Sequence, residues 1–128
     1  MNDKKRLEQI RDRPGMYGLN GTYHSTAMLV LGFDLGRSGD LLDGFTEWLV
    51  VRKGEPSSLV WFALVFQEAL PGGSLQNMAH MDPHQDQQAV DRLFELLLQF
   101  LELREDEEAL ALIHERYKSL NALDGQEG

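Results

Sequence analysis

The chain has 128 residues, a formal net charge of −9 and no cysteine. Its length suits a single domain, and the lack of thiols excludes disulfides, thiolate zinc sites and cysteine nucleophiles. The excess of Asp and Glu disfavours binding to a phosphate backbone, which needs a basic surface. The charged N-terminus does not resemble a signal peptide, and the longest strongly apolar run, Leu59 to Phe66, is too short to span a membrane. We therefore expect a cytoplasmic protein.

The N-terminal segment predicts a short surface helix followed by a tight turn. Charged residues with apolar positions three apart run from Asp3 to Arg11, with Asp3 as the expected helix cap. Pro14 ends this helix, because a residue that precedes proline disfavours helical backbone angles. We expect Met16 and Tyr17, which follow in the turn, to pack into the core and anchor it.

A second helix is expected from Thr22 or Ser25, either of which can cap it, to about Gly36. Gly32 lies inside this helix and costs about 1 kcal/mol relative to Ala unless another helix packs closely there. The apolar face at helical spacing consists of Tyr23, Ala27, Val30 and Leu31.

A third helix follows the break at residues 37–39. Asp40, with Asp43 three residues later, has the spacing of a capping signal, and Gly54 with Pro56 ends the helix. The stripe that this helix presents is Leu41, Phe45, Trp48, Leu49 and Arg52.

The fourth element, Leu59 to Leu70, opens at Ser57 or Ser58 and is apolar on all sides. A buried strand would have the same pattern, but a run approaching twelve residues favours a central helix.

The last third of the chain has the strongest helical signal. A loop from Ser74 to Gln85 precedes a helix that is expected from Asp86 onward. Its stripe is Val90, Leu93, Phe94, Leu97 and Leu101. A charged break at 104–108 separates it from a final helix that carries Leu110, Ile113, Tyr117 and Leu120. The predicted fold is all-α, a single compact bundle of five or six helices over residues 1–123 with a disordered tail at 124–128.

Several segments have residue types that catalysis or ligand binding would need, but none forms a complete site. The run from His80 to His84 holds two His and one Asp beside a proline, with no further ligand at motif spacing, so a polar loop is the better interpretation. Glu47 and Glu68 adjoin apolar helices, but nothing pairs them as an acid and a base. The serines fit helix caps better than nucleophiles. We expect no enzyme activity, no catalytic residue, no metal and no cofactor.

A glycine turn and an acidic cluster are the remaining candidates. The turn from Gly18 to Gly21 precedes a helix and could bind an anion, but it lacks the phosphate-loop Gly-Lys-Ser/Thr pattern, so a tight turn is favoured. The acidic cluster comprises Glu102, Glu105, Asp106, Glu107 and Glu108. It either meets a basic partner or forms a solvated helix junction.

Two resemblances begin at the segment Ile10 to Tyr17, which reads IRDRPGMY. It is similar to a segment near the start of the ATPase domain of the DNA gyrase B subunit. That family also needs a helix with Glu and Asn ligands and an Asp-x-Gly-x-Gly loop, and this chain has neither, so we reject an ATPase function. The second resemblance is to immunity proteins of bacterial polymorphic toxin systems. It rests on four segments, Arg13 to Tyr17, Phe45 to Leu49, Leu59 to Phe66 and Ala89 to Leu101, and departs from the pattern at Gly18, where an aliphatic residue is usual.

The resemblance implies a toxin-neutralising protein that binds a cognate toxin, and the acidic balance would suit a basic toxin domain. The candidate partner-binding residues are Asp34, Asp40, Asp43, Glu47, Glu102 and Glu105. Nucleic acid and membranes are not expected as partners. The alternative is a structural or regulatory module that forms a homodimer through the helix from Asp86 to Leu103.

Overall fold

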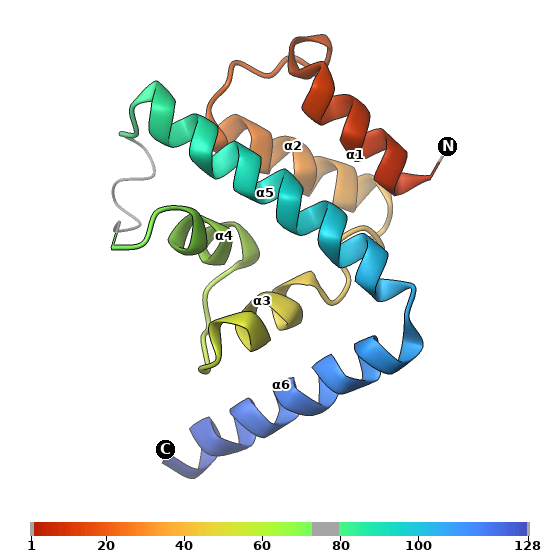
Figure 1. The fold of residues 1–128 in the computed structure, drawn as a ribbon, viewed down its shortest axis with the longest axis vertical. Helices are drawn as coiled ribbons and strands as arrows, with labels where there is room; N and C mark the ends of the chain where they lie inside the picture. The colour runs from red at the N-terminus through yellow and green to blue at the C-terminus, as the bar shows by residue number, and fades with distance from the viewer. Residues whose placement is uncertain (1, 73–79, 128) are drawn as a thin grey trace.

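The computed structural model describes residues 2–72 and 80–127, with residues 123–127 described by their backbone alone. Within these residues the fold is all-α, with six α-helices, one 3-10 turn and no strand, as the sequence predicts. The elements are α1 (Asp3–Asp12), η1 (Pro14–Tyr17), α2 (Tyr23–Gly36), α3 (Phe45–Lys53), α4 (Trp61–Ala69), α5 (Pro83–Arg104) and α6 (Glu107–Glu127) (Figure 1).

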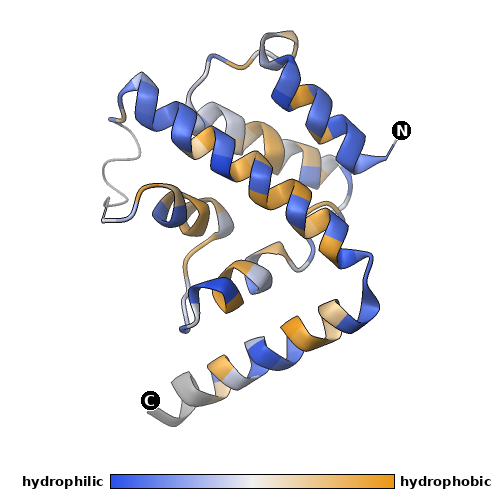
Figure 2. Ribbon diagram, viewed as in Figure 1, coloured by the Kyte–Doolittle hydropathy of each residue, from blue (hydrophilic) through white to orange (hydrophobic). Residues whose placement is uncertain are grey.

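Helix α5 is the centre of the fold. It packs against α1, α2, α3, α4 and α6, and Figure 1 shows it crossing the molecule diagonally between α1 and α3. The apolar residues of α5 alternate with polar ones at helical spacing, which Figure 2 shows as orange and blue patches along one helix. The buried side chains of α5 are Ala89, Leu93, Phe94, Leu96, Leu97, Phe100 and Leu101.

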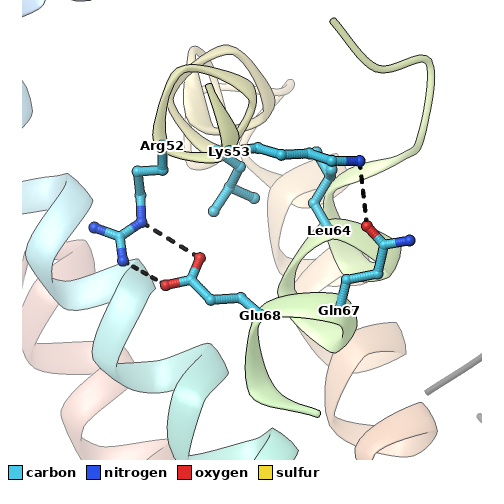
Figure 3. A pocket seen from close by; sticks show the side chains of 6 residues that line it. Arg52, Lys53, Leu64, Gln67 and Glu68 are labelled. Atoms are coloured by element: carbon cyan, nitrogen blue, oxygen red, sulfur yellow. Dashed lines mark hydrogen bonds and ion pairs between the residues drawn. The ribbon is translucent and has the colours of Figure 1, made fainter. Parts of the chain in front are cut away.

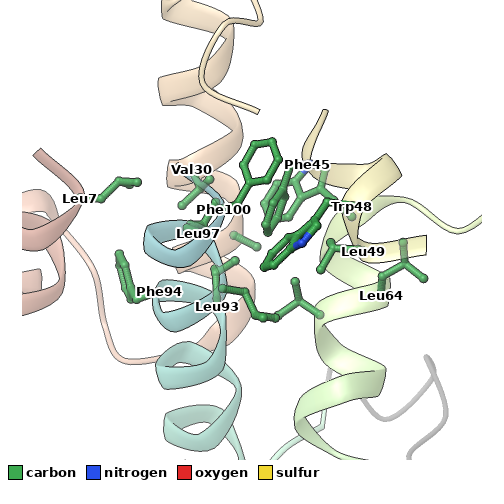
Figure 4. Packing of buried hydrophobic residues seen from close by; sticks show 14 of the residues in the cluster. Leu7, Val30, Phe45, Trp48, Leu49, Leu64, Leu93, Phe94, Leu97 and Phe100 are labelled. Atoms are coloured by element: carbon green, nitrogen blue, oxygen red, sulfur yellow. The ribbon is translucent and has the colours of Figure 1, made fainter. Parts of the chain in front are cut away.

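An aromatic cluster fills the core where α3, α4 and α5 meet (Figure 4). The Phe45 ring lies 5.4 Å from Phe100, 6.0 Å from Trp48 and 6.1 Å from Trp61, measured between ring centroids. Such tilted pairs add about 0.5–1.5 kcal/mol each beyond the burial of their area. This cluster makes the short helices α3 and α4 stable although neither would persist alone in water.

The expected cap is confirmed at one helix, α2. The caps of α1 and α5 differ from the sequence prediction, and α4 begins after Val60 with no side-chain cap instead of at Ser57 or Ser58. The Thr22 side chain accepts the amide of Ser25 at the start of α2. At α5, Asp82 and Gln85 form a capping box and Pro83 occupies the first turn, so this helix begins before the expected Asp86. At α1, however, the cap is Asn2, whose Oδ1 accepts the Lys5 amide at 2.8 Å. The expected cap, Asp3, instead pairs with Arg37 at 3.2 Å.

The predicted start of α3 is wrong, because tertiary contacts satisfy the backbone of residues 40–43. The Asp34 Oδ1 accepts the Leu42 amide at 2.8 Å, and the Arg104 Nη1 donates to three carbonyls of this segment. With those groups bonded outside a helix, α3 begins only at Phe45, after Gly44 with a φ of 86°. Leu41 is still fully buried, although it lies in a turn.

Two further expectations concern exposure and helix type. Met16 is 73% exposed rather than packed in the core, because η1 is held by its own backbone bonds, such as Leu19 N to Pro14 O at 3.2 Å. Tyr17 is partly buried against the core, as predicted. The apolar run in the fourth element is the helix α4, not a strand, although it begins at Trp61 after an extended segment.

The remaining boundaries lie at the loop before α5 and at the C-terminus. The predicted loop from Ser74 to Gln85 lies in part outside the described residues, which resume at 80. Helix α6 has helical backbone to Glu127, past the expected boundary at 123, and fraying of the tail stays a prediction. In the described part of the chain, no helix is both long and apolar enough to cross a membrane.

Candidate functional site

Four of the six predicted partner-binding carboxylates gather around the C-terminal end of α5. Glu102 and Glu105 lie in its last turn and at its cap, and Asp40 and Asp43 lie on the connection between α2 and α3. All four are exposed. We call this group, Asp40, Asp43, Glu102 and Glu105, the acidic end.

Arg104 brings the two halves of the acidic end together. Its Nη1 donates to the carbonyl of Asp40 at 2.8 Å, of Leu41 at 3.1 Å and of Asp43 at 3.3 Å. Its guanidinium also lies 5.4 Å from the ring of the buried Phe100. Segments that are about sixty residues apart in sequence are therefore fixed against each other by one side chain.

The N-terminus of α1 borders the acidic end. A hollow of about 400 Å³ is lined by Asp3, Lys4, Glu102 and Glu105, among others. Lys4 Nζ lies 3.9 Å from the Glu102 carboxylate, whose side chain remains 74% exposed. Such a loose surface pair contributes little to stability, so Glu102 stays available to another cation.

The other two predicted carboxylates have partners inside the chain. Asp34 is half-buried, and its carboxylate accepts the Leu42 amide, so it supports the connection rather than presenting a free surface charge. Glu47 Oε2 lies 3.0 Å from Nδ1 of His114 and links α3 to α6.

The candidate acid–base pair is not brought together as a dyad. Glu47 pairs with His114, whereas Glu68 forms a two-pronged pair with Arg52 across a shallow pocket of about 280 Å³ between α3 and α4 (Figure 3). Arg52 also stacks on Trp48, with its Cζ 5.0 Å from the ring centroid. These contacts fasten α4 to α3.

The candidate metal loop contains the residue that caps α5. Asp82 caps α5, and its Oδ1 accepts the Gln85 amide at 2.8 Å. His84 lies exposed in the first turn of α5, and His80 is exposed before it. Among the residues that the structure describes, no three His, Asp or Glu side chains lie close enough to hold a metal ion.

The glycine turn before α2 is occupied by acceptors from the chain itself. Asn20 Oδ1 accepts from the Thr22 amide at 3.1 Å and from the Ser25 hydroxyl at 2.9 Å. Asp86 Oδ1 accepts the Tyr23 amide at 2.8 Å. A carboxylate from α5 thus stands where an anion would bind at this helix N-terminus.

Sequence reasoning missed the two residues that organise these surfaces, Arg104 and Asp86. A basic residue in the last turn of a helix is a common helix-end feature, and an acid in the first turn is equally common. Neither pattern indicates a contact with a segment some sixty residues away.

The helix expected to form the alternative dimer, α5, is packed inside the fold of a single chain. The apolar stripe of α5 is buried against the other helices of the same chain, so a dimer through residues 86–103 would have to use the polar face. Comparisons of the chain with models of protein families, with curated proteins and with solved structures find no match.

Proposed function

We propose that this chain is a non-catalytic, toxin-neutralising protein of the immunity type that binds a basic toxin domain through its acidic end. The observation that carries the proposal is that Arg104 ties the segment of Asp40 and Asp43 to the end of α5, which carries Glu102 and Glu105. Its Nη1 donates to backbone carbonyls of that segment and not to the four exposed carboxylates, which are therefore not neutralised by this arginine.

The position of Glu102 supports a binding role over a structural one. The C-terminal end of a helix carries partial negative charge, which disfavours a carboxylate by about 0.3–1 kcal/mol at an exposed site. Glu102, in the last turn of α5, therefore costs the free protein stability, whereas Glu105 also lies just before α6, whose N-terminus favours negative charge. A cationic partner would relieve the unfavourable charge at the end of α5, so its binding energy is larger than it would be at a neutral surface.

The overall charge fits the same partner. A net charge of −9 attracts a basic protein over distances of about 10 Å at moderate salt and raises its association rate. The similarity of residues 13–17, 45–49, 59–66 and 89–101 to immunity proteins adds the biological class, and toxins that attack nucleic acids are themselves basic. The proposal places the protein in the cytoplasm, in keeping with its lack of cysteine.

The test begins with a pull-down of the tagged protein from its native lysate, eluted with salt and identified by mass spectrometry. A stoichiometric partner with a basic, toxin-like domain is expected. Binding is then compared for two variants that each lose four charges. One is D40N/D43N/E102Q/E105Q, at the acidic end. The matched control, E55Q/D91N/E95Q/E115Q, neutralises exposed carboxylates elsewhere.

The acidic-end variant should bind between about fourfold and several hundredfold more weakly at low salt, since each of the four lost surface pairs contributes about 0.2–1 kcal/mol. The control variant should bind more slowly but with a much smaller loss of affinity. Equal affinities for the two variants would show that the acidic end is not the binding surface.

A further inference from the structure

Helix α6 is attached to the rest of the fold by few buried contacts. Among its described side chains only Ile113 is buried, at 8% exposed, whereas α5, a helix of similar length, buries seven. Within the described chain α6 packs mainly on α3 and on the end of α5, and Figure 1 shows it running along one edge of the molecule. Leu112, beside Ile113, is 48% exposed. The partly buried Tyr117 and Leu120 complete the apolar face with which α6 packs on the core, and this face is the docking surface of the helix.

The junction between α5 and α6 is close to helical already. It consists of residues 105 and 106, and Glu105 has helical backbone angles, with φ −72° and ψ −16°. Asp106 makes the break, because its Oδ1 accepts the amides of Glu108 at 3.0 Å and Ala109 at 3.2 Å and so caps α6. A change of backbone angles within this two-residue junction would join the two helices.

We propose that α6 exchanges between two copies of this chain, so that the α6 of each protomer docks on the α3 of the other. In this dimer α5 and α6 form one continuous helix. A continuous helix carries α6 along its axis by about 1.5 Å per residue, which takes Ile113 away from its own α3. The second copy supplies the identical docking face, so the contact of Ile113 with the core and the pair of His114 with Glu47 are remade without loss.

Repulsion between like charges at the junction disfavours the exchanged dimer. In a continuous helix Glu102 would face Asp106 and Glu105 would face Glu108 at spacings where like charges repel. The break also keeps the cap at Asp106. Both effects favour the monomer, and both can be altered by substitutions outside the core and outside the acidic end. The proposal does not depend on the toxin-neutralising function.

The first test uses crosslinking through introduced cysteines, which are the only thiols present because the chain itself has none. The single variants Glu47→Cys and His114→Cys are mixed, unfolded, refolded together at high concentration and treated with a short bis-maleimide. The replaced side chains lie 3.0 Å apart between Nδ1 and Oε2, so exchange predicts a covalent dimer with a 47–114 crosslink identified by mass spectrometry. A mixture of Gln9→Cys, on α1, with His114→Cys serves as the control. A 47–114 yield no higher than that of the control would overturn the proposal.

The second test alters the junction in opposite directions. Asp106→Ala removes the α6 cap and should raise the dimerisation constant about tenfold or more, because a dimer contains two junctions. Glu107→Pro places proline at the first position of α6, where it is tolerated, but inside a continuous helix it would lower the constant by more than about 100-fold. Sedimentation velocity measures both. Equal dimer content in the two folded variants would contradict exchange through a continuous helix. If either variant fails to fold by circular dichroism, the crosslink decides.

Discussion

Replacing Arg104 by Met tests whether one side chain holds the α2–α3 connection in place. Met keeps most of the apolar stem over Phe100 but donates no hydrogen bonds. The carbonyls of Asp40, Leu41 and Asp43 then lose a donor at 2.8, 3.1 and 3.3 Å. The predicted helix does not form in this connection, so no helical hydrogen bonds stabilise its backbone.

The expected loss of stability follows from these contacts. A hydrogen bond to a charged group contributes about 1.5–3 kcal/mol when buried, but the bonds to Asp40 and Asp43 are exposed, and water can replace them. The partly buried bond to Leu41 therefore dominates. Losing the cation–π contact with Phe100 adds about 0.5–1 kcal/mol. The free energy of unfolding should fall by about 2–3 kcal/mol, which lowers Tm by roughly 10 °C for a domain of this length.

Urea unfolding followed by tryptophan fluorescence measures this change, because Trp48 and Trp61 are each only 5% exposed and report the loss of the core. Arg104→Lys keeps the charge without the planar fork and should lie between the parent and Arg104→Met. Arg92→Met, which removes a surface pair from the same helix, should cost less than about 0.5 kcal/mol. If Arg104→Met unfolds within about 0.5 kcal/mol of the parent, Arg104 does not hold the connection.

Three further predictions concern backbone freedom and pH. Gly32 is exposed inside α2, and a Cβ at this position meets no atom within 4 Å. Gly32→Ala should therefore raise the free energy of unfolding by about 0.5–1 kcal/mol in thermal melts. A decrease would reveal an unseen packing contact. Gly44 has a φ of 86°, and a Cβ at this position would lie 3.3 Å from Phe100 Cζ. Gly44→Ala should therefore lower the free energy of unfolding, measured in urea, by about 1–3 kcal/mol. An unchanged free energy would refute this strain. Burial raises the pKa of Tyr23 far above its usual value of about 10, and its hydroxyl donates to the Phe62 carbonyl at 2.6 Å. The Tyr23 hydroxyl loses its proton at a lower pH in the unfolded chain than in the folded one. The free energy of unfolding should therefore be unaffected by this group below pH ~10 and should fall above it. The urea midpoint should show this fall in the parent and not in Tyr23→Phe.

Local sequence patterns predicted the helices well where local interactions decide. The stripe from Leu93 to Leu101 is buried as expected, and the predicted cap at Thr22 is present. The start of α3 was missed because Asp40 and Asp43 have the spacing of a capping signal, while long-range bonds from Asp34 and Arg104 occupy that backbone. Propensity and periodicity describe neighbours within a few residues and contain nothing about such partners.

The candidate site was predictable in composition but not in geometry. An excess of carboxylates identifies an acidic protein, and exposure of Glu102 follows from its place off the apolar stripe, whereas Glu105 lies in the charged break after it. Their proximity to Asp40 and Asp43 depends on how α5 crosses the chain, which no local pattern specifies. The same applies to Asp34, which looks like a surface acid in sequence and is a hydrogen-bond acceptor for the Leu42 amide in the fold.

The central place of α5 has a consequence for the synthesis of the protein. Helices α1 to α4 are all made before α5, yet each of them packs against it. A nascent chain that ends before Pro83 lacks the α5 side chains of the core, such as Phe100, whose ring lies 5.4 Å from that of Phe45. The core is complete only after α5 has left the ribosome, so the chain needs its last third to finish folding. Until then its apolar surfaces are open to chaperones and to aggregation, and a strong acidic bias helps to keep such a chain in solution.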